Sequence, residues 1–384
     1  MRRPCSLCPR LNLLILIGLT LGFPELLRPS LKPEPEEPRR VLRLAPGPGN
    51  PRNSEGDFIQ LKDGRVLFIY THFTGGEGDH ARAHLAARES RDGGRAWSSS
   101  DLVVVAGEGG MNVMSVSLLR LRSGPIALFY LRKNSERDCR PVVRFSRDET
   151  RTWSEPVECI TDEIGYYVLN NARVAQLAGG RLVVPVAQHT GADGKWRPGE
   201  VLCYLSDDEG KTWRRGPARL TATAERKPVD LMEPGLVETT PNQLLMVIRT
   251  RVGCQYFARS SDGGEHWSEP EPSPIGSPES PATLTKFPGS KTLALIWNDH
   301  RGRTMEYRRA NPPHRTPLAL ALSHDGGRTW EKTKIVENDP DCGYCYTAAR
   351  WIGEKLLLGY CAHRSPWGLA TTRVTLLDRR WIER

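Results

Sequence analysis

The stretch SRDGGRAW, residues 90–97, places a serine and an aspartate before two glycines and a tryptophan. Aspartate and glycine favour the backbone angles of tight turns. The same frame, which we call the box, returns at residues 146–153, 206–213, 260–267 and 323–330. Successive copies begin roughly 58 residues apart, a period near that of repeat arrays and propellers. The chain is therefore expected to fold from repeated units.

Each box follows a run rich in β-branched and aromatic residues that opens with Gly or Asn, such as GRVLFIY (64–70) and NQLLMVIR (242–249). A period of this length accommodates several short strands, the content of one four-stranded antiparallel blade. The spacing predicts an all-β six-bladed β-propeller over residues 50–384, with box turns in five blades. We expect residues 356–363 and 369–377 to complete the sixth blade with the first strand, 58–61.

The box aspartates form neither a catalytic nor a calcium-binding set in this interpretation. Equivalent positions of successive blades lie one per blade on the rim, so they cannot converge on one ligand. Ser and Asp are expected to bond the turn backbone. The box tryptophans are expected to pack within or between blades. They are Trp97, Trp153, Trp213, Trp267 and Trp330.

These five frames, the second with Thr150 where Gly is usual, resemble the Asp-box repeats of the sialidase (neuraminidase) superfamily. The resemblance covers roughly residues 50–384 and implies a six-bladed β-propeller. Asp-boxes also occur in other propellers, some of them non-catalytic. Function must therefore be argued from other residues.

The N-terminal region differs in kind from the rest. Residues 1–10 carry positive charge and residues 11–23 form a short apolar run, so 1–23 resembles a secretory signal peptide. No A-x-A cleavage pattern follows, which leaves an uncleaved signal anchor open. We expect an exported protein, secreted or periplasmic, or one anchored to a membrane through residues 11–23. Residues 24–49, rich in Pro and charge, are predicted to be a linker.

The net charge of +9 is compatible with acidic substrates or surfaces. No basic helix or basic groove with interleaved aromatics is visible, so a nucleic-acid partner is not expected. Cys342 and Cys345 have C-x-x-C spacing, but no second pair at zinc spacing accompanies them. Neither a metal nor another cofactor is therefore predicted; a buried thiol or a single disulfide remains open.

Cleavage of a sialoside places a carboxylate next to the reacting carbon. A neutral tyrosine helped by a base avoids the repulsion that an anionic nucleophile meets there. The segment MEPGLVETTPNQLLMVIRT (232–250) is similar to a family segment that implies Glu233 as this base and Arg249 as a carboxylate-binding arginine. The segment DCGYCYTAAR (341–350) likewise implies Tyr346 as the nucleophile.

Two further segments complete the resemblance. HRTPLALALSHDGGRTW (314–330) implies Arg315 as a second carboxylate-binding arginine. The Gly-rich loop in 75–94 implies Asp79 as the general acid and base, and partial desolvation is expected to raise its pKa.

The first strand departs from the family pattern. Family members carry an Arg-Ile-Pro motif there, whereas this chain reads NSEGDFIQL (53–61), with Glu55 and Asp57 near the arginine position. A carboxylate there repels a substrate carboxylate unless it is paired. Either Arg132 or Arg173 supplies the missing charge from an adjacent blade, or the substrate differs.

Polar residues on apolar strands are further candidates for the substrate site. They are Asn112, Tyr166, Asn171 and Gln255. Together the residues predict an exo-α-sialidase-like hydrolase that releases terminal sialic acid or a related nonulosonate with retention. Its partners are expected to be sialylated or other acidic glycans. Two alternatives stay open: a propeller glycosidase acting on another sugar, and a non-catalytic carbohydrate-binding propeller.

Overall fold

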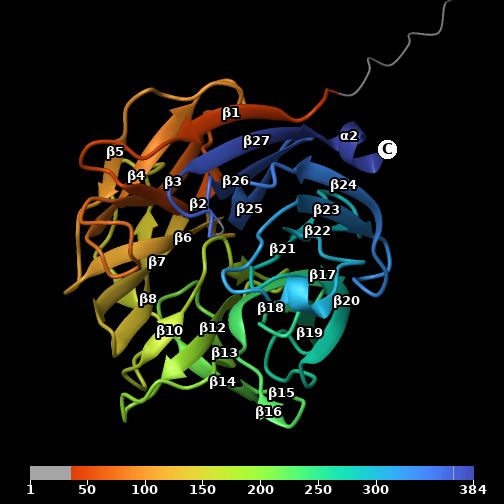
Figure 1. Cartoon of the computed structure of the whole chain (residues 1–384). Helices are drawn as coiled ribbons and strands as arrows, with labels where there is room; N and C mark the ends of the chain where they lie inside the picture. Colours follow the sequence, from red (N-terminus) through yellow and green to blue (C-terminus); the bar gives the residue numbers. More distant parts are fainter. Residues whose placement is uncertain (1–35, 366) are drawn as a thin grey trace, which may run out of the picture. The chain divides into compact units, whose positions relative to one another are not determined.

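The computed structural model describes residues 36–365 and 367–384 (Figure 1). The predicted signal peptide or anchor, 1–23, and the first part of the predicted linker lie outside the described residues. Within the described part of the chain, no helix is long and apolar enough to cross a membrane. The described chain is built mainly of antiparallel β-sheets, as the box spacing predicts.

Three sheets contain four strands each, paired in chain order. The first is formed by β2 (Arg52–Gln60), β3 (Val66–Phe73), β4 (Ala83–Ser90) and β5 (Leu102–Val105). The second is formed by β17 (Met232–Thr240), β18 (Gln243–Arg249), β19 (Cys254–Ser260) and β20 (Glu271–Gly276). The third is formed by β21 (Thr283–Lys286), β22 (Leu293–Asn298), β23 (Leu318–Ser323) and β24 (Glu331–Glu337). Each of them is the size of one predicted repeat.

The segment between the first two of these sheets forms one nine-stranded sheet. Its first part comprises β6 (Asn112–Arg120), β7 (Ile126–Ser135), β8 (Asp138–Ser146) and β9 (Val157–Glu158). Its second part comprises β10 (Tyr166–Val168), β11 (Ala175–Gln176), β12 (Leu182–Thr190), β13 (Glu200–Ser206) and β14 (Arg214–Leu220). The parts are joined by one parallel bridge between Tyr166 and Cys139. Two repeats are therefore fused at this point.

The remaining elements are short or terminal. A two-stranded sheet contains β15 (Thr223–Ala224) and β16 (Lys227–Pro228). The helices are α1 (Met305–Arg308) and α2 (Arg379–Glu383). The last sheet has the order β1 (Arg39–Leu44), β27 (Thr372–Asp378), β26 (Lys355–His363) and β25 (Gly343–Ile352).

The last sheet is completed by β1, and not by residues 58–61 as predicted. Residues 58–61 belong to β2, which pairs with β3, whereas β1 pairs with β27 in antiparallel register. Residues 39–44 thus form a strand inside the segment predicted to be a linker. Their sequence, RRVLRL, has enough apolar side chains for Val41, Leu42 and Leu44 to pack against a hydrophobic core.

The inner strands of successive sheets contact one another. Strand β2 contacts β6 and β25, β17 contacts β12 and β21, and β21 contacts β25. These contacts bring residues far apart in the sequence together.

The box residues make the predicted turn contacts. In the third box, Asp208 Oδ1 accepts hydrogen bonds from the backbone of Lys211 and Thr212, and Ser206 Oγ accepts one from Gly210. Trp213 Nε1 donates to the Gly210 carbonyl oxygen. All five box tryptophans pack against hydrophobic clusters. The box is therefore a structural turn, as predicted.

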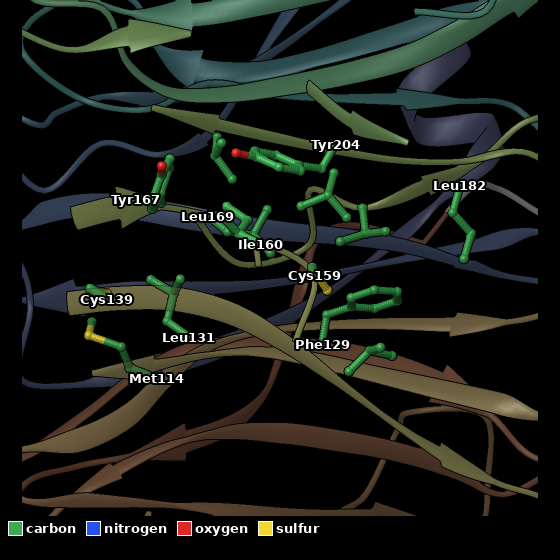
Figure 2. Packing of buried hydrophobic residues seen from close by; sticks show 14 of the residues in the cluster. Met114, Phe129, Leu131, Cys139, Cys159, Ile160, Tyr167, Leu169, Leu182 and Tyr204 are labelled. Atoms are coloured by element: carbon green, nitrogen blue, oxygen red, sulfur yellow. The ribbon is translucent and has the colours of Figure 1, made fainter. Parts of the chain in front are cut away.

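The nine-stranded sheet has its own core. Figure 2 shows Cys159 and Ile160 between Leu131 of β7 and Leu182 of β12, and Phe129 of β7 belongs to the same buried cluster. All five side chains are buried. Burying one such apolar side chain contributes about 1.5–3 kcal/mol, so this packing stabilises the nine-stranded sheet.

Candidate active site

Four inner strands carry a polar residue at a β-bulge. Glu55 of β2, Ser115 of β6, Glu233 of β17 and Tyr346 of β25 have left-handed φ values of 50°, 62°, 44° and 56°. The pairing register of each strand shifts at that residue. A bulge re-aims the side chain of the extra residue, and a left-handed backbone costs a non-glycine residue roughly 1–3 kcal/mol. Such strain is common at functional sites.

Two of these residues meet directly. The Tyr346 hydroxyl donates a hydrogen bond to Glu233 Oε1 at 3.2 Å. Arg249 Nη1 lies 2.6 Å from Glu233 Oε2 and 3.5 Å from the Tyr346 oxygen. The structure thus brings together three residues that the sequence predicts to share a site. Burial, followed by the negative charge of Glu233, holds the pKa of Tyr346 well above its ordinary value.

Arg249 makes a further ion pair, and a second arginine, Arg315, lies beside the Tyr346 ring. Arg249 Nη2 also donates to Glu279 Oε1 at 2.8 Å. Arg315 lies with its guanidinium 5.6 Å from the centre of the Tyr346 ring and donates to the carbonyl oxygens of Glu279 and Trp367. Among residues 36–365 and 367–384, no carboxylate lies within ion-pair distance of Arg315. Its positive charge is therefore available to an acidic ligand.

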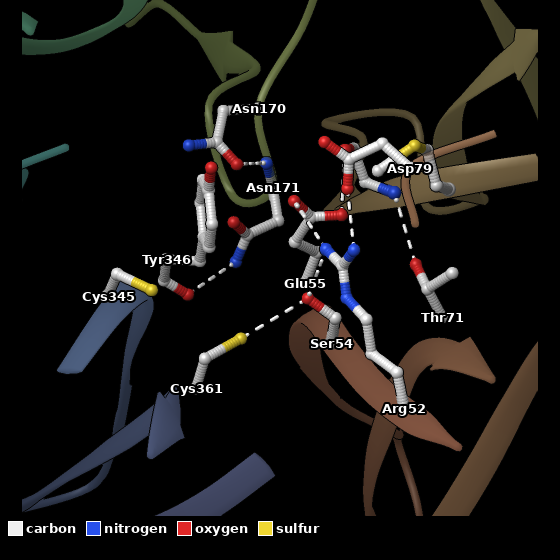
Figure 3. Close-up of polar contacts among 12 residues, drawn as sticks. Arg52, Ser54, Glu55, Thr71, Asp79, Asn170, Asn171, Cys345, Tyr346 and Cys361 are labelled. Atoms are coloured by element: carbon white, nitrogen blue, oxygen red, sulfur yellow. Dashed lines mark hydrogen bonds and ion pairs between the residues drawn. The ribbon is translucent and has the colours of Figure 1, made fainter. Parts of the chain in front are cut away.

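A second ionic group forms on β2 and the loop after β3 (Figure 3). Arg52 Nη1 lies 2.5 Å from Asp79 Oδ1, and its Nη2 lies 3.8 Å from Glu55 Oε1. Arg52 and Glu55 are buried, whereas the Asp79 side chain is 55% exposed. Arg52 thus pairs the carboxylate whose charge seemed unbalanced in the sequence.

The side-chain carboxyl groups of Glu55 and Asp79, which both pair with Arg52, differ in pKa. Burial, partly offset by Arg52, raises the pKa of Glu55 to about 8. Burial also opposes ionisation of Asp79, but the nearby Arg52 charge and hydrogen bond outweigh it and lower the pKa of Asp79. The prediction that desolvation raises the pKa of Asp79 is therefore wrong for this structure, because that prediction did not include Arg52.

The positive charge next to Glu55 on the first strand does not come from Arg132 or Arg173, the two residues that the sequence analysis suggested. Arg132 pairs with Glu158, and Arg173 Nη1 donates to Thr283 Oγ1 at 3.0 Å. Among the described residues, neither forms a hydrogen bond or ion pair with Tyr346 or Asp79, and Arg52 is the cation that pairs with Glu55. The sequence does contain a sign of this pair, because Arg52 and Glu55 carry opposite charges three residues apart. They come within ion-pair distance where the strand bulges.

Two other predicted residues have structural partners. Asp57 accepts hydrogen bonds from the backbone of Phe58 and Leu118 and lies 3.2 Å from Arg350. Gln255 Nε2 donates to Ser277 Oγ and to the Ser280 carbonyl oxygen. Through these contacts each residue links separate segments of the chain.

The remaining predicted residues lie around the two ionic groups. Asn171 Nδ2 donates to the Tyr346 carbonyl oxygen at 3.0 Å and so holds the bulged backbone. Asn112 Nδ2 donates to the Asp79 carbonyl oxygen at 2.9 Å. Lys133, which the sequence did not single out, donates to the same oxygen at 2.7 Å. Its Nζ also lies 5.3 Å from the centre of the Tyr166 ring.

Among the described residues, no group of three or more His, Cys, Asp or Glu side chains is placed to hold a metal ion. The chemistry available at the two ionic groups is a phenol beside a carboxylate, a second pair of carboxyl groups, and the buried arginines Arg52, Arg249 and Arg315.

Comparison with known proteins matches the sequence to a family. The family described as BNR repeat-like domain matches residues 97–354. A sialidase from Bacteroides fragilis (strain YCH46) is 28% identical over 218 residues, which are 53% of this chain and 36% of that protein. The chain thus spans about a third of that relative's length.

Solved structures show the same fold. A protein of unknown function from Dyadobacter fermentans superposes with a TM-score of 0.68 at 16% identity, covering 89% of this chain and 99% of its own. The K499G mutant of NanB sialidase from Streptococcus pneumoniae superposes with a TM-score of 0.67 at 14% identity, covering 89% and 71%. The chain belongs to the BNR repeat-like domain family, within the sialidase superfamily.

Proposed function

We propose that this protein is an exo-α-sialidase-like glycoside hydrolase that releases terminal sialic acid, or a related nonulosonate, with retention of configuration. One observation carries the proposal: the Tyr346 hydroxyl lies 3.2 Å from Glu233, which is itself paired with Arg249. A phenol held against a carboxylate and a guanidinium is suited to nucleophilic attack beside an acidic group.

The proposed scaffold is a six-bladed β-propeller. Four of its blades correspond to the four-stranded sheets, and the nine-stranded sheet supplies two more. Strand β25 contacts β2 and β21, β2 contacts β6, and β17 contacts β12 and β21, while β6 and β12 belong to the same nine-stranded sheet; these contacts support this arrangement. In a propeller the inner strands surround one axis, which explains why bulged residues from different sheets share a site.

In the first step Tyr346 attacks the anomeric carbon of the sialoside. Its hydroxyl proton passes to Glu233 as the bond to carbon forms. Arg249 stabilises the negative charge that develops on the phenol oxygen, 3.5 Å from its Nη1. Asp79 donates a proton to the departing glycosidic oxygen.

In the second step Asp79 removes a proton from water, which attacks the same carbon. The bond to Tyr346 breaks, and the phenol regains its proton from Glu233. Two inversions at one carbon give overall retention.

Two arginines are suited to bind the carboxylate of an acidic substrate. Arg315 has no carboxylate partner among the described residues and is buried, so a substrate carboxylate gains strong charge-assisted hydrogen bonds there. A substrate carboxylate that also reaches Arg52 competes with Asp79 for the guanidinium. That competition raises the pKa of Asp79 toward the value that a proton donor needs.

The proposed partners are sialylated or other acidic glycans. The proposed location is outside the cytoplasm, and it rests on residues 1–23 alone.

The test is fluorophore release from 4-methylumbelliferyl α-sialoside by the full chain. Tyr346→Phe should lower kcat by at least about 1000-fold because it removes the nucleophilic oxygen. Tyr344→Phe is the matched control: Tyr344 lies on the same strand but is fully buried in a hydrophobic cluster. It should retain activity.

Other outcomes separate the alternatives. Equal activity in wild type and Tyr346→Phe would contradict the proposed nucleophile. A folded wild-type protein without turnover on this substrate would favour another acidic glycoside. If it binds such glycosides without cleaving them, the non-catalytic alternative is correct.

A further inference from the structure

Two cysteines face each other beside the proposed nucleophile. Cys345 of β25 and Cys361 of β26 are directly opposed in the antiparallel register of these strands. Directly opposed residues of such a pair have Cα atoms about 4.5–5.5 Å apart, a separation that a disulfide spans without large backbone movement. Both thiols are free and buried. The register therefore permits a covalent link one residue before Tyr346.

The C-x-x-C spacing of Cys342 and Cys345 does not describe this pair. Cys342 lies just before β25, and its thiol donates to Asp339 Oδ2 at 3.6 Å. The Cys345 thiol donates instead to the carbonyl oxygen of Trp367 at 3.4 Å. The two thiols of the C-x-x-C segment thus have different partners. The cysteine that opposes Cys345 in the sheet is Cys361.

The sulfur atoms of this pair contact both ionic groups of the site. Arg315 Nη1 donates a hydrogen bond to Cys345 Sγ at 3.2 Å. Cys361 Sγ lies 3.2 Å from Ser54 Oγ, which accepts a hydrogen bond from Arg52 Nη2 at 3.2 Å (Figure 3). A neighbouring guanidinium stabilises a thiolate, which is the reactive form of cysteine. The pair therefore lies in surroundings that favour thiol chemistry.

The two thiols differ in pKa. Burial opposes ionisation of Cys345, but the hydrogen bond from Cys361 and the charge of Arg315 outweigh it and hold the Cys345 pKa below its ordinary value of 9.0. The same hydrogen bond, followed by burial, holds the pKa of Cys361 well above that value. Cys345 is therefore the thiol that attacks an oxidant first, and Cys361 is placed to attack second.

We propose that Cys345 and Cys361 are a redox-active pair that hydrogen peroxide converts to a disulfide. The Cys345 thiolate attacks one peroxide oxygen, the O–O bond breaks, and the departing hydroxide takes up the proton that Cys345 released. The product is a sulfenic acid and water. The sulfur of Cys361 then attacks the Cys345 sulfur, the S–O bond breaks, and the oxygen leaves as water with the Cys361 proton. Peroxide reaches the pair through the site, where Tyr346 is only half-buried.

The redox state of the pair sets the charge next to Arg315. A Cys345 thiolate is a counter-ion for this guanidinium and competes with a carboxylate ligand. A disulfide sulfur carries no charge, so oxidation leaves the guanidinium to the ligand. This consequence rests on the proposed function, because it concerns the arginine proposed to hold the substrate carboxylate, whereas the disulfide itself does not. The oxidised protein should therefore bind sialic acid more tightly than the reduced protein.

Mapping of the cross-link tests the pair. The full chain is reduced, freed of reductant and treated with hydrogen peroxide, and the remaining thiols are blocked with N-ethylmaleimide under denaturing conditions before digestion and mass spectrometry. We expect two peptides joined through Cys345 and Cys361, two hydrogen atoms lighter than the reduced peptides and separated again by dithiothreitol. A Cys345 that stays unmodified, links to Cys342 or becomes a sulfinic acid would overturn the proposal.

Two variants assign the roles of the thiols. Cys361→Ser removes the second thiol, so Cys345 should stop at the sulfenic acid, which dimedone labels. Cys342→Ser is the matched control, because it removes the other cysteine of the C-x-x-C segment and should leave the cross-link as in wild type. Equal dimedone labelling of Cys345 in wild type and Cys361→Ser, or loss of the cross-link in Cys342→Ser, would contradict the pairing.

A binding measurement separates this pair from the proposed function. Titration calorimetry with N-acetylneuraminic acid compares oxidised and reduced protein at pH 9, above the Cys345 pKa, where the reduced protein holds mostly thiolate. Oxidation should lower Kd by about 5-fold or more, the lower end of typical coupling between two sites. Equal or weaker binding by the oxidised protein would overturn the link to Arg315. If neither form binds or cleaves a sialoside, the proposed function fails, while a mapped cross-link still supports the pair.

Discussion

Tyr346 donates a hydrogen bond to Glu233 across 3.2 Å, although the two residues lie 113 positions apart in the chain. Both residues sit at bulges with a left-handed backbone, in β25 and β17. In a regular strand their side chains would follow the alternation of their neighbours. The bulges therefore create the contact, and the packed sheets supply the energy that holds both strained residues.

Arg52 is predicted to hold the second ionic group together. Arg52→Met removes the cation that Glu55 and Asp79 share, and at pH 9, above the Glu55 pKa of about 8, we expect the free energy of unfolding to fall by about 3 kcal/mol. Urea denaturation of both proteins measures this loss. Arg65→Met is the control because Arg65 pairs with Asp63 and Glu89 nearer the surface and should cost less than about 1 kcal/mol.

A double variant tests whether the loss comes from this pair. Adding Glu55→Gln to Arg52→Met removes the stranded carboxylate, so part of the lost stability should return. Strictly additive effects of the two substitutions would show that Arg52 acts through other contacts, such as its position 4.4 Å from the Phe73 ring.

Glu55 should make stability depend on pH. Its folded pKa, about 8, lies above its ordinary value of 4.5, so the fold favours the protonated form. This contribution is complete below the unfolded pKa and is lost as pH rises toward 8. Relative to Glu55→Gln, wild type should lose up to about 1.4 kcal/mol per pH unit within that window. Parallel urea titrations at pH 5, 6, 7 and 8 measure the difference, and a constant difference would contradict the shifted pKa.

Arg315 is predicted to bind the substrate carboxylate. Arg315→Met removes charge-assisted hydrogen bonds and should lower kcat/KM for an α-sialoside about 100-fold, mainly through a higher KM. Steady-state kinetics provide the measurement. Arg301→Met, which removes an arginine already paired with Asp299, is the control and should change KM little. An unchanged KM in Arg315→Met would exclude this role.

The box aspartates are predicted to act on stability alone. Asp208→Ala removes two hydrogen bonds from the backbone and two from side chains, those of Ser206 Oγ and Thr212 Oγ1, and it should lower the unfolding free energy by about 1–2 kcal/mol. Asp207 is the exposed neighbour that pairs with Arg181, so Asp207→Ala should lower the unfolding free energy by less than Asp208→Ala does. Denaturation curves and kcat are measured for both. A fall in kcat with unchanged stability would mean that the box takes part in the site.

The box was readable from the sequence because its contacts are local. Ser206, Asp208 and Gly210 bond one another within a few residues, and turn chemistry depends on residue type. The group of Tyr346, Glu233 and Arg249 was predictable only through family resemblance, because nothing local relates residues so far apart.

Other features depend on packing that sequence patterns do not carry. The role of Arg52 was missed because the β2 bulge alters the spacing between the arginine and the rest of the strand. Polar residues on apolar strands look alike in sequence, yet Gln255 bonds Ser277 and Ser280 while Asn171 holds Tyr346. Strand β1 was hidden by its Pro-rich surroundings, since its partner β27 lies at the other end of the chain.

Covalent trapping tests the central claim most directly. The wild-type chain is incubated with 2,3-difluorosialic acid, whose fluorine at C3 slows breakdown of a glycosyl intermediate, and the products are analysed by intact mass and peptide mapping. The account predicts one added 3-fluorosialosyl unit on Tyr346, formed as the fluoride at C2 leaves. A stable adduct on another residue, or turnover of an α-sialoside by wild type with no adduct on Tyr346, would contradict it.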